Sequence, residues 1–299
     1  MIDFSAPPSP LQLIEDDFLL QKKIKLYIKR DDLLGEQIQG NKWRKLKYNL
    51  IDAHEKGYKK LLTFGGAWSN HIYATAAAGN RFGFETYAVI RGEKPAKFSN
   101  TLLFAKEMGM QFFFVSRSDY KEKNNATFLE KIKKEIGHFY PIPEGGTTPL
   151  ALMGCKEMVA EIQQAIDFDV IATGVGTGGT LAGIVEGISL SQQAIGFSSL
   201  KGDDTLSPFI QNLISKKDNK WEVNFDYHFG GYAKTNPTLI EFIKALYQKH
   251  QIQFEPIYNG KMMYGLYDLI HKDYFAPGTT IVAVHTGGLQ GLRGFKDFV

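Results

Sequence analysis

Short apolar runs alternate with longer amphipathic stretches along most of this chain. The apolar runs have the length and residue types of buried or half-buried β-strands. The predicted strands cover residues 24–28, 61–64, 86–90, 112–115, 139–142, 169–175, 194–199, 223–229 and 279–286. Between them, apolar residues at helical spacing predict helices that begin after Asn41, Ser69 and Gly179 or cover 99–108, 125–136, 150–166, 237–250 and 262–271.

The alternation of strands and helices indicates α/β architecture with parallel sheets. Each intervening helix is long enough for the crossover that two parallel strands require. A Gly-, Thr- and Pro-rich connection near Glu144 to Pro149 separates two such α/β units, and the first strand could return to the second unit. The chain shows no internal repeat and no low-complexity tract.

Composition and charge narrow the range of functions. The net charge of +3 comes from 35 basic and 32 acidic residues that are spread along the 299 residues, which argues against nucleic-acid or membrane-surface binding. Cys155 is the single cysteine, so an internal disulfide and a thiolate metal cluster are excluded. We expect a cytoplasmic protein, since neither a signal peptide nor a membrane-spanning apolar run is present.

Lys42 is the strongest candidate for chemistry, because it lies where a loop turns into the first long helix. Gly40 and Asn41 are typical turn and N-cap residues, and Gly57 follows the helix as a stop. A desolvated lysine with cationic neighbours has a pKa lowered from about 10.4 towards 7 or 8, and its neutral amine can form a Schiff base. The same turn holds further basic residues, which alone would indicate only a solvated helix start: Arg44, Lys45 and Lys47.

Two glycine-rich turns predict binding loops at strand ends. In the first, Ser69 and Asn70 follow a strand and open a helix, so they are either site residues or simply helix caps. The second, VGTGGT, nominally satisfies GxGxxG between a strand and a helix, a context in which backbone amides bind phosphate. We predict a site for a single phosphate, to which Thr177 and Thr180 add hydroxyls.

A third glycine-rich turn places Thr286 at the carboxyl end of the last strand, where ligands of open α/β folds bind. Tyr232 and Tyr258 lie beside glycines or a proline rather than in apolar stripes, although single tyrosines are more often packing residues. None of the seven histidines has a metal-ligand spacing, so we expect no metal site. Cys155 is expected to pack as a small apolar group.

Five motifs, in this order, resemble those of pyridoxal-phosphate enzymes of the tryptophan synthase β fold, also called fold type II. They are GNKWRK at 40–45, SNH at 69–71, GTGGT at 176–180, YNGKMMYGL at 258–266 and HTGG at 285–288. Within that fold, the chain is most similar to D-cysteine desulfhydrase and 1-aminocyclopropane-1-carboxylate (ACC) deaminase. The resemblance implies a homodimer with a large cofactor-binding domain, 1–45 and 146–299, and a small mobile domain, 46–145.

The resemblance also implies roles for individual residues. Lys42 would carry pyridoxal 5'-phosphate through a Schiff base, and Asn70 would hydrogen-bond the ring hydroxyl. Ser69, Tyr232 and Tyr258 match the family's serine and tyrosines that contact substrate. The remaining cofactor-binding residues that it implies are Lys45, Gly176, Thr177, Gly178, Gly179, Thr180, Asn259 and Thr286.

The implied substrate is a small amino acid. ACC deaminases carry a glutamate where Asn259 stands, and a neutral amide favours β-elimination from D-cysteine over the opening of the ACC ring. ACC deaminase remains the alternative, because Trp68 beside Ser69 departs from the family pattern and could reshape the pocket. Two further alternatives are a non-catalytic pyridoxal-phosphate carrier and a dinucleotide-dependent oxidoreductase.

Overall fold

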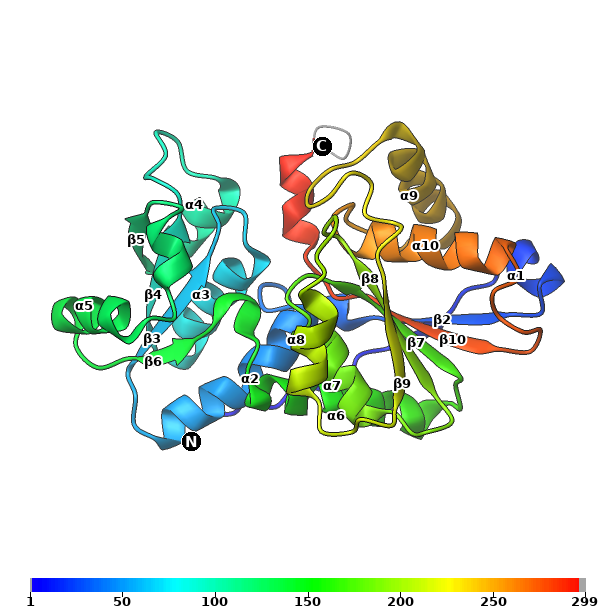
Figure 1. Ribbon diagram of the computed structural model, residues 1–299, viewed down its shortest axis with the longest axis horizontal. Helices are drawn as coiled ribbons and strands as arrows, with labels where there is room; N and C mark the ends of the chain where they lie inside the picture. Colours follow the sequence, from blue (N-terminus) through cyan, green and yellow to red (C-terminus); the bar gives the residue numbers. More distant parts are fainter. Residues whose placement is uncertain (1, 296–299) are drawn as a thin grey trace.

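The computed structural model describes residues 2–295 and contains two sheets, each belonging to one lobe of the molecule (Figure 1). The large lobe holds a six-stranded sheet in the order β1-β2-β10-β7-β8-β9, which is parallel except for β1. The small lobe holds a four-stranded parallel sheet in the order β5-β4-β3-β6. The chain therefore has the two parallel-sheet α/β units expected from its sequence.

The strands coincide with most of the predicted apolar runs. In the large lobe they are β1 (Leu11–Leu13), β2 (Lys25–Lys29), β7 (Val170–Val175), β8 (Gln193–Ser198), β9 (Lys220–Asn224) and β10 (Thr280–Val284). In the small lobe they are β3 (Lys60–Gly65), β4 (Glu85–Arg91), β5 (Gln111–Val115) and β6 (Tyr140–Ile142). The central strand β7 is buried along its whole length, as a parallel strand covered on both faces should be.

Helices cover both faces of the large sheet and leave two apolar cores, one on each side. The helices α9 (Pro237–His250) and α10 (Asn259–His271) bury Leu239, Ile243 and Leu266 against one face. On the other face, α6 (Pro149–Ala165), α7 (Gly179–Gly187) and α8 (Leu206–Leu213) enclose the second core. The other α-helices are α1 (Asp17–Gln21), α2 (Gly40–Glu55), α3 (Asn70–Phe82), α4 (Asn100–Glu107) and α5 (Ala126–Ile136).

Side-chain caps define several helix starts, among them the predicted cap at Ser69. Ser69 accepts hydrogen bonds from the N–H groups of His71 and Ile72, and Ser99 accepts one from Leu102. Asn125, Thr148 and Asn236 cap α5, α6 and α9 in the same way. Cys155 is fully buried within α6, where it packs as expected.

Two predicted element boundaries were wrong, and helix α8 was missed. Helix α2 begins at Gly40 with Gln39 as N-cap, not after Asn41. The edge strand β9 covers Lys220–Asn224 rather than the predicted 223–229. It ends there because Asn224 accepts a hydrogen bond from the N–H of Asp226 and so forms a turn. Helix α8 was not predicted, since Pro208 reads as a breaker although it lies in the first turn, where a missing N–H costs little.

Helix α2 joins the two lobes. Its residues Trp43, Leu46 and Leu50 pack in an apolar core of the small lobe. Its other side lies against α6 of the large lobe, where a side chain on Gly154 would come within 1.9 Å of the Arg44 carbonyl oxygen. The expected domain boundary at residue 45 falls inside this unbroken helix, so the division into a large domain and a small mobile domain stays a prediction.

Candidate active site

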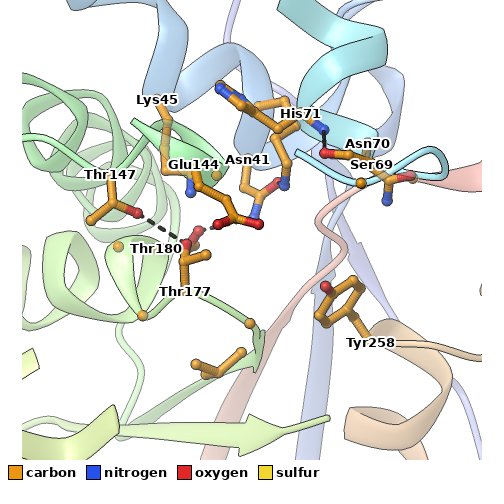
Figure 2. Close-up of a pocket in the computed structure, with 18 of the residues that line it drawn as sticks. Asn41, Lys45, Ser69, Asn70, His71, Glu144, Thr147, Thr177, Thr180 and Tyr258 are labelled. Atoms are coloured by element: carbon orange, nitrogen blue, oxygen red, sulfur yellow. Dashed lines mark hydrogen bonds between the residues drawn. The ribbon is translucent and has the colours of Figure 1, made fainter. Parts of the chain in front are cut away.

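A cavity of about 770 Å³ lies where the carboxyl ends of strands from both sheets meet. The end of β3 contributes the loop with Ser69 and Asn70, β7 contributes the loop that starts at Gly176, and β10 contributes Thr286. The structure thus brings the three glycine-rich turns of the sequence into one site, together with Lys42 at the start of α2. Figure 2 shows Ser69 and Asn70 from the first of these loops and Thr177 and Thr180 from the second around the cavity.

Hydrogen bonds through Asn41 connect the amine of Lys42 to the loop of residues 176–180. Lys42 Nζ donates a hydrogen bond to Asn41 Oδ1 at 2.8 Å, and Asn41 Nδ2 donates to Thr180 Oγ1 at 2.9 Å. Burial, and then the charge of Lys45, lower the pKa of Lys42 to about 7. A large fraction of this amine is therefore neutral and nucleophilic near neutral pH.

Gly40 allows helix α2 to start in direct contact with strand β10. Its φ of +59° is left-handed, and a Cβ here would lie 1.9 Å from the Thr286 carbonyl oxygen. The N–H of Asn41 donates to the same oxygen at 3.3 Å. Only glycine fits this approach, which sets the position of Lys42 relative to Thr286.

The basic residues next to Lys42 are not a solvated helix face. Arg44 is buried and donates to Asp31 Oδ1 and to Glu161 Oε2 at 2.9 and 2.8 Å. Lys45 is also buried, and its Nζ has no hydrogen-bond or ion-pair partner among residues 2–295. Burial lowers the pKa of Lys45 to about 8. An anion in the cavity would supply the missing counter-charge.

Lys45 and the loop of residues 176–180, which carries Thr177 and Thr180, line the same part of the cavity (Figure 2). Within the described chain, no hydrogen bond uses the backbone N–H groups of this loop, which leads into helix α7. Gly178 has a φ of +80°, and a side chain on Gly179 would collide with Thr147 at 2.5 Å. Thr177 Oγ1 lies 3.0 Å from Thr147 Oγ1. The loop and Lys45 therefore form a site that fits a phosphate group.

Tyr258 and Tyr232 both line the cavity, and their ring centroids are 6.1 Å apart. Burial raises the pKa of each phenol, so both stay protonated and can donate hydrogen bonds at neutral pH. A Cβ on Gly176 would lie 3.1 Å from the Tyr258 hydroxyl, which places that hydroxyl over the start of the loop. Lys261, which the sequence did not single out, supports Tyr232 by donating to the carbonyls of His228 and Gly231, each at 2.8 Å.

Ser69 and Asn70 are both helix-start residues and cavity residues. Ser69 Oγ accepts the cap hydrogen bonds of α3, so its hydroxyl hydrogen stays available to the cavity. Asn70 Oδ1 accepts a hydrogen bond from Gln290 Nε2 at 2.9 Å. The cap alternative is therefore confirmed, and both residues also line the cavity, where their role stays a prediction.

His71 follows Asn70 and presents an unprotonated nitrogen. Thr63 Oγ1 donates to the Ile142 carbonyl at 2.9 Å and lies 2.7 Å from His71 Nε2, so it accepts a hydrogen bond from that nitrogen. His71 Nδ1 is then a buried acceptor that has no hydrogen-bond partner among the described residues, 2–295. Burial, with the charges of Lys45 and Lys42, lowers the pKa of His71 well below 6.5, which keeps the ring neutral.

Asn259 was predicted to bind the cofactor, but it does not line the cavity. Its Oδ1 accepts from the N–H and the hydroxyl of Thr286, while its Nδ2 donates to Glu255 and to the Gly287 carbonyl. Thr286 is the member of this group that reaches the cavity. Glu255, which the sequence analysis missed, is fully buried and accepts from the N–H groups of Ile257, Tyr258 and Asn259.

Residues 2–295 contain neither a cluster of metal ligands nor a membrane-spanning helix. No group of His, Cys, Asp or Glu in this part of the chain could hold a metal ion. No helix within it is long and apolar enough to cross a membrane.

Solved structures share this architecture. An ACC deaminase homologue superposes with a TM-score of 0.84 at 30% identity, covering 97% of this chain and 92% of the other. An O-acetylserine-dependent cystathionine β-synthase from Helicobacter pylori gives a TM-score of 0.72 at 14% identity, covering 98% and 97%, which shows the fold alone. The fold and the lysine site together define a fold type II enzyme.

Relatives found by sequence also include ACC deaminases and a D-cysteine desulfhydrase. A putative ACC deaminase of Pyrococcus horikoshii is 35% identical, with 91% of this chain and 87% of the relative covered. A bifunctional D-cysteine desulfhydrase/ACC deaminase of Arabidopsis thaliana is 32% identical, with 91% and 74% covered.

The chain belongs to the pyridoxal-phosphate-dependent enzymes, whose family model matches residues 7–287. Within that family it falls into the group of ACC deaminase and D-cysteine desulfhydrase. Its cofactor is pyridoxal 5'-phosphate, and the unpaired Lys45 with the free amides of 176–180 fits the phosphate of that group. The assignment rules out the dinucleotide-dependent oxidoreductase and identifies an enzyme rather than a non-catalytic carrier.

Proposed function

We propose that this enzyme eliminates the β-substituent of a small amino acid, with D-cysteine as its best natural substrate. With uptake of one water, D-cysteine yields pyruvate, ammonia and hydrogen sulfide. The bound pyridoxal phosphate supplies an electron-withdrawing ring that accepts the negative charge developing at the substrate Cα. The residues of the chain bind that group and the substrate, and they move the protons.

Lys42 is proposed to bind the cofactor and then to accept the Cα proton of the substrate at its Nζ. Two observations support this role: the pKa of about 7, and the hydrogen bond to Asn41 that fixes the amine beside the 176–180 loop. A lysine with an ordinary pKa would be almost fully protonated at neutral pH and could not accept a proton.

The phosphate is assigned to Lys45 and to the loop of Gly176, Thr177, Gly178, Gly179 and Thr180. Asn70 is assigned to the ring hydroxyl. Ser69 and the phenols of Tyr232 and Tyr258 are assigned to the substrate, to which all three can donate hydrogen bonds. These side chains line one cavity, which is the arrangement that the assignment needs.

The preference for D-cysteine depends on one observation, the neutral pair Thr286 and Asn259 at the carboxyl end of β10. A carboxylate in place of the Asn259 amide would add a negative charge behind the Thr286 hydroxyl and so favour a protonated, more strongly electron-withdrawing ring, whereas the neutral amide adds no charge. Breaking a C–S bond releases a good leaving group and needs less charge stabilisation than opening the cyclopropane ring. Losing one preorganised electrostatic partner costs roughly 10²- to 10³-fold in rate.

The test is kcat/KM of the wild type for D-cysteine and for ACC, with pyruvate and 2-oxobutanoate as the measured products. We expect pyruvate to dominate. Asn259→Glu should move the ratio towards ACC, and Asn259→Gln, of matched size but neutral, should not. A wild type that prefers ACC, or equal ratios in the two variants, would refute the electrostatic argument.

ACC deamination is the second candidate, because the relatives and a solved homologue carry that name. The same assay decides between the two. We also propose a homodimer, as the resemblance implies, and sedimentation of the purified protein tests it.

A further inference from the structure

The chain beyond β10 crosses from the large lobe to the small lobe beside the active site. It turns at Gly287 and Gly288, whose φ angles are +73° and +84°, and continues as a short 3₁₀ helix, η4 (Leu289–Gly294). This red helix lies between the two lobes in Figure 1. A Cβ on Gly294 would be 3.3 Å from the Trp68 ring, so η4 packs against the loop that carries Ser69.

One side chain of η4 reaches into the site. Gln290 lines the cavity, and its Nε2 donates to Asn70 Oδ1 at 2.9 Å. The other end of the Asn70 amide lies over Gly288, where a Cβ would be 2.6 Å from Asn70 Nδ2. Asn70 Nδ2 has no acceptor among residues 2–295, although Asn70 lines the cavity. The amide is thus held by Gln290 at its oxygen, while its N–H groups remain unpaired.

The orientation of this amide decides what it can bind. A carboxamide offers an acceptor at one end and a donor at the other, and turning it over exchanges the two. Because Gln290 occupies the oxygen, Asn70 offers N–H donors to the cavity. An oxygen attached to an aromatic ring, and above all an ionised one, needs such a donor.

We propose that Gln290 is a positioning residue, which fixes the Asn70 amide so that it donates to the ring oxygen of the cofactor. The inference rests on the proposed contact of Asn70 with that oxygen. Gln290 itself acts through Asn70 and not on the substrate. Orientation by hydrogen-bond polarity has a direct consequence: a donor at position 290 keeps Asn70 in place, and an acceptor there turns it over.

Three substitutions separate polarity from size. Gln290→Lys keeps a donor, Gln290→Glu offers only an acceptor near neutral pH, and Gln290→Met offers neither. The readout is the dissociation constant of pyridoxal phosphate for cofactor-free full-length protein, followed by visible absorption. We expect Gln290→Lys to stay within about threefold of the wild type. Gln290→Met should bind several-fold more weakly and Gln290→Glu about tenfold or more weakly, as expected for losing a hydrogen bond to a charged group.

The substitutions also introduce a charge at position 290. As a control for this charge, Gln290→Lys and Gln290→Glu are measured again in an Asn70→Ala background. If polarity acts through Asn70, most of the difference between the two variants disappears there. An undiminished difference would mean that the charges act on the cofactor directly, and the proposal would be overturned. If the Asn70→Ala variant binds the cofactor as tightly as the wild type, the proposed contact of Asn70 with the ring oxygen is refuted instead. Denaturation curves identify any variant whose loss reflects unfolding.

Discussion

Asn259 holds Thr286 by two hydrogen bonds, accepting the backbone N–H and the side-chain hydroxyl at its Oδ1, both at 3.0 Å. Its Nδ2 is bound to Glu255 Oε1 and the Gly287 carbonyl at 3.0 and 2.9 Å. Every hydrogen-bonding group of this side chain is therefore used inside the protein. Asn259 acts on the cavity only through the hydroxyl that it orients.

Removing this orientation should reduce catalysis more than cofactor binding. Asn259→Ala frees the Thr286 hydroxyl and leaves Glu255 with one hydrogen bond fewer, while the phosphate site at Lys45 is untouched. We expect kcat/KM for D-cysteine to fall about tenfold, with the pyridoxal-phosphate dissociation constant changed less than threefold. Steady-state kinetics and a cofactor titration measure the two effects. Equal losses in both would indicate a general disturbance of the site.

Lys42 should destabilise the cofactor-free protein, and the effect should depend on pH. Its pKa is about 7 in the folded protein and 10.5 without burial, so the unfolded chain binds more protons between these values. Stability therefore rises with pH across this window, and below pH 7 the full penalty of burying the charged amine remains. Lys42→Met should stabilise the cofactor-free protein by roughly 2 kcal/mol at pH 6.5, and the gain should vanish near pH 10.5.

Urea denaturation of both proteins at several pH values tests this prediction. A gain that is independent of pH would show that packing of the methionine, and not the charge of Lys42, is responsible. Lys42→Met should also abolish turnover, since no other amine takes its place.

Lys45 should contribute to cofactor affinity without stabilising the fold of the cofactor-free protein. Its buried amine has no partner within residues 2–295, and its pKa is lowered to about 8. Lys45→Met should weaken pyridoxal-phosphate binding at least tenfold, because a charged hydrogen bond contributes about 1.5–3 kcal/mol. Lys47→Met is the matched control, since Lys47 lies on the same helix and pairs with Glu157 at 2.9 Å. Similar affinities of the two variants would contradict the phosphate assignment.

Gly40 should be needed for folding for two reasons: its close contact with the Thr286 backbone and its left-handed backbone conformation. An alanine here would combine a φ of +59° with a Cβ 1.9 Å from the Thr286 carbonyl oxygen. Gly57→Ala is the control, because Gly57 has a similar φ of +74° but nothing within 4 Å of a Cβ. We expect about 1 kcal/mol of destabilisation at position 57 and more than about 3 kcal/mol at position 40. Equal losses would show that strain alone matters.

Much of the fold is predictable because local signals agree with the tertiary structure. Apolar runs such as 170–175 are buried strands, and caps such as Ser69 and Asn236 start the helices that follow them. The three glycine-rich turns meet because the carboxyl ends of parallel strands share one edge. The edge strand β1 and the short helix α1 escaped prediction, since three and five residues carry too little periodicity.

The supporting residues of the site could not be predicted, because their partners are far away in the sequence. Gln290 and Asn70 are separated by 220 positions, and Lys261 binds carbonyls 30 and 33 positions away. Glu255 had a weak local signal, a carboxylate four positions before Asn259, where it can accept from the free N–H groups that begin α10. The indirect role of Asn259 follows only from the coordinates of Thr286.

Lys42 stands between two backbone contacts with the large lobe, Gly40 against Thr286 and Arg44 against Gly154, two residues away on either side. The backbone that carries this amine is therefore packed against the frame that also holds the 176–180 loop, the large lobe. Ser69 and Asn70 belong to the other frame, which is anchored on β3 and α3. If substrate binding draws the lobes together, Ser69 would move towards Lys42, which would stay in place. Closure would then select substrates without disturbing the attachment point of the cofactor.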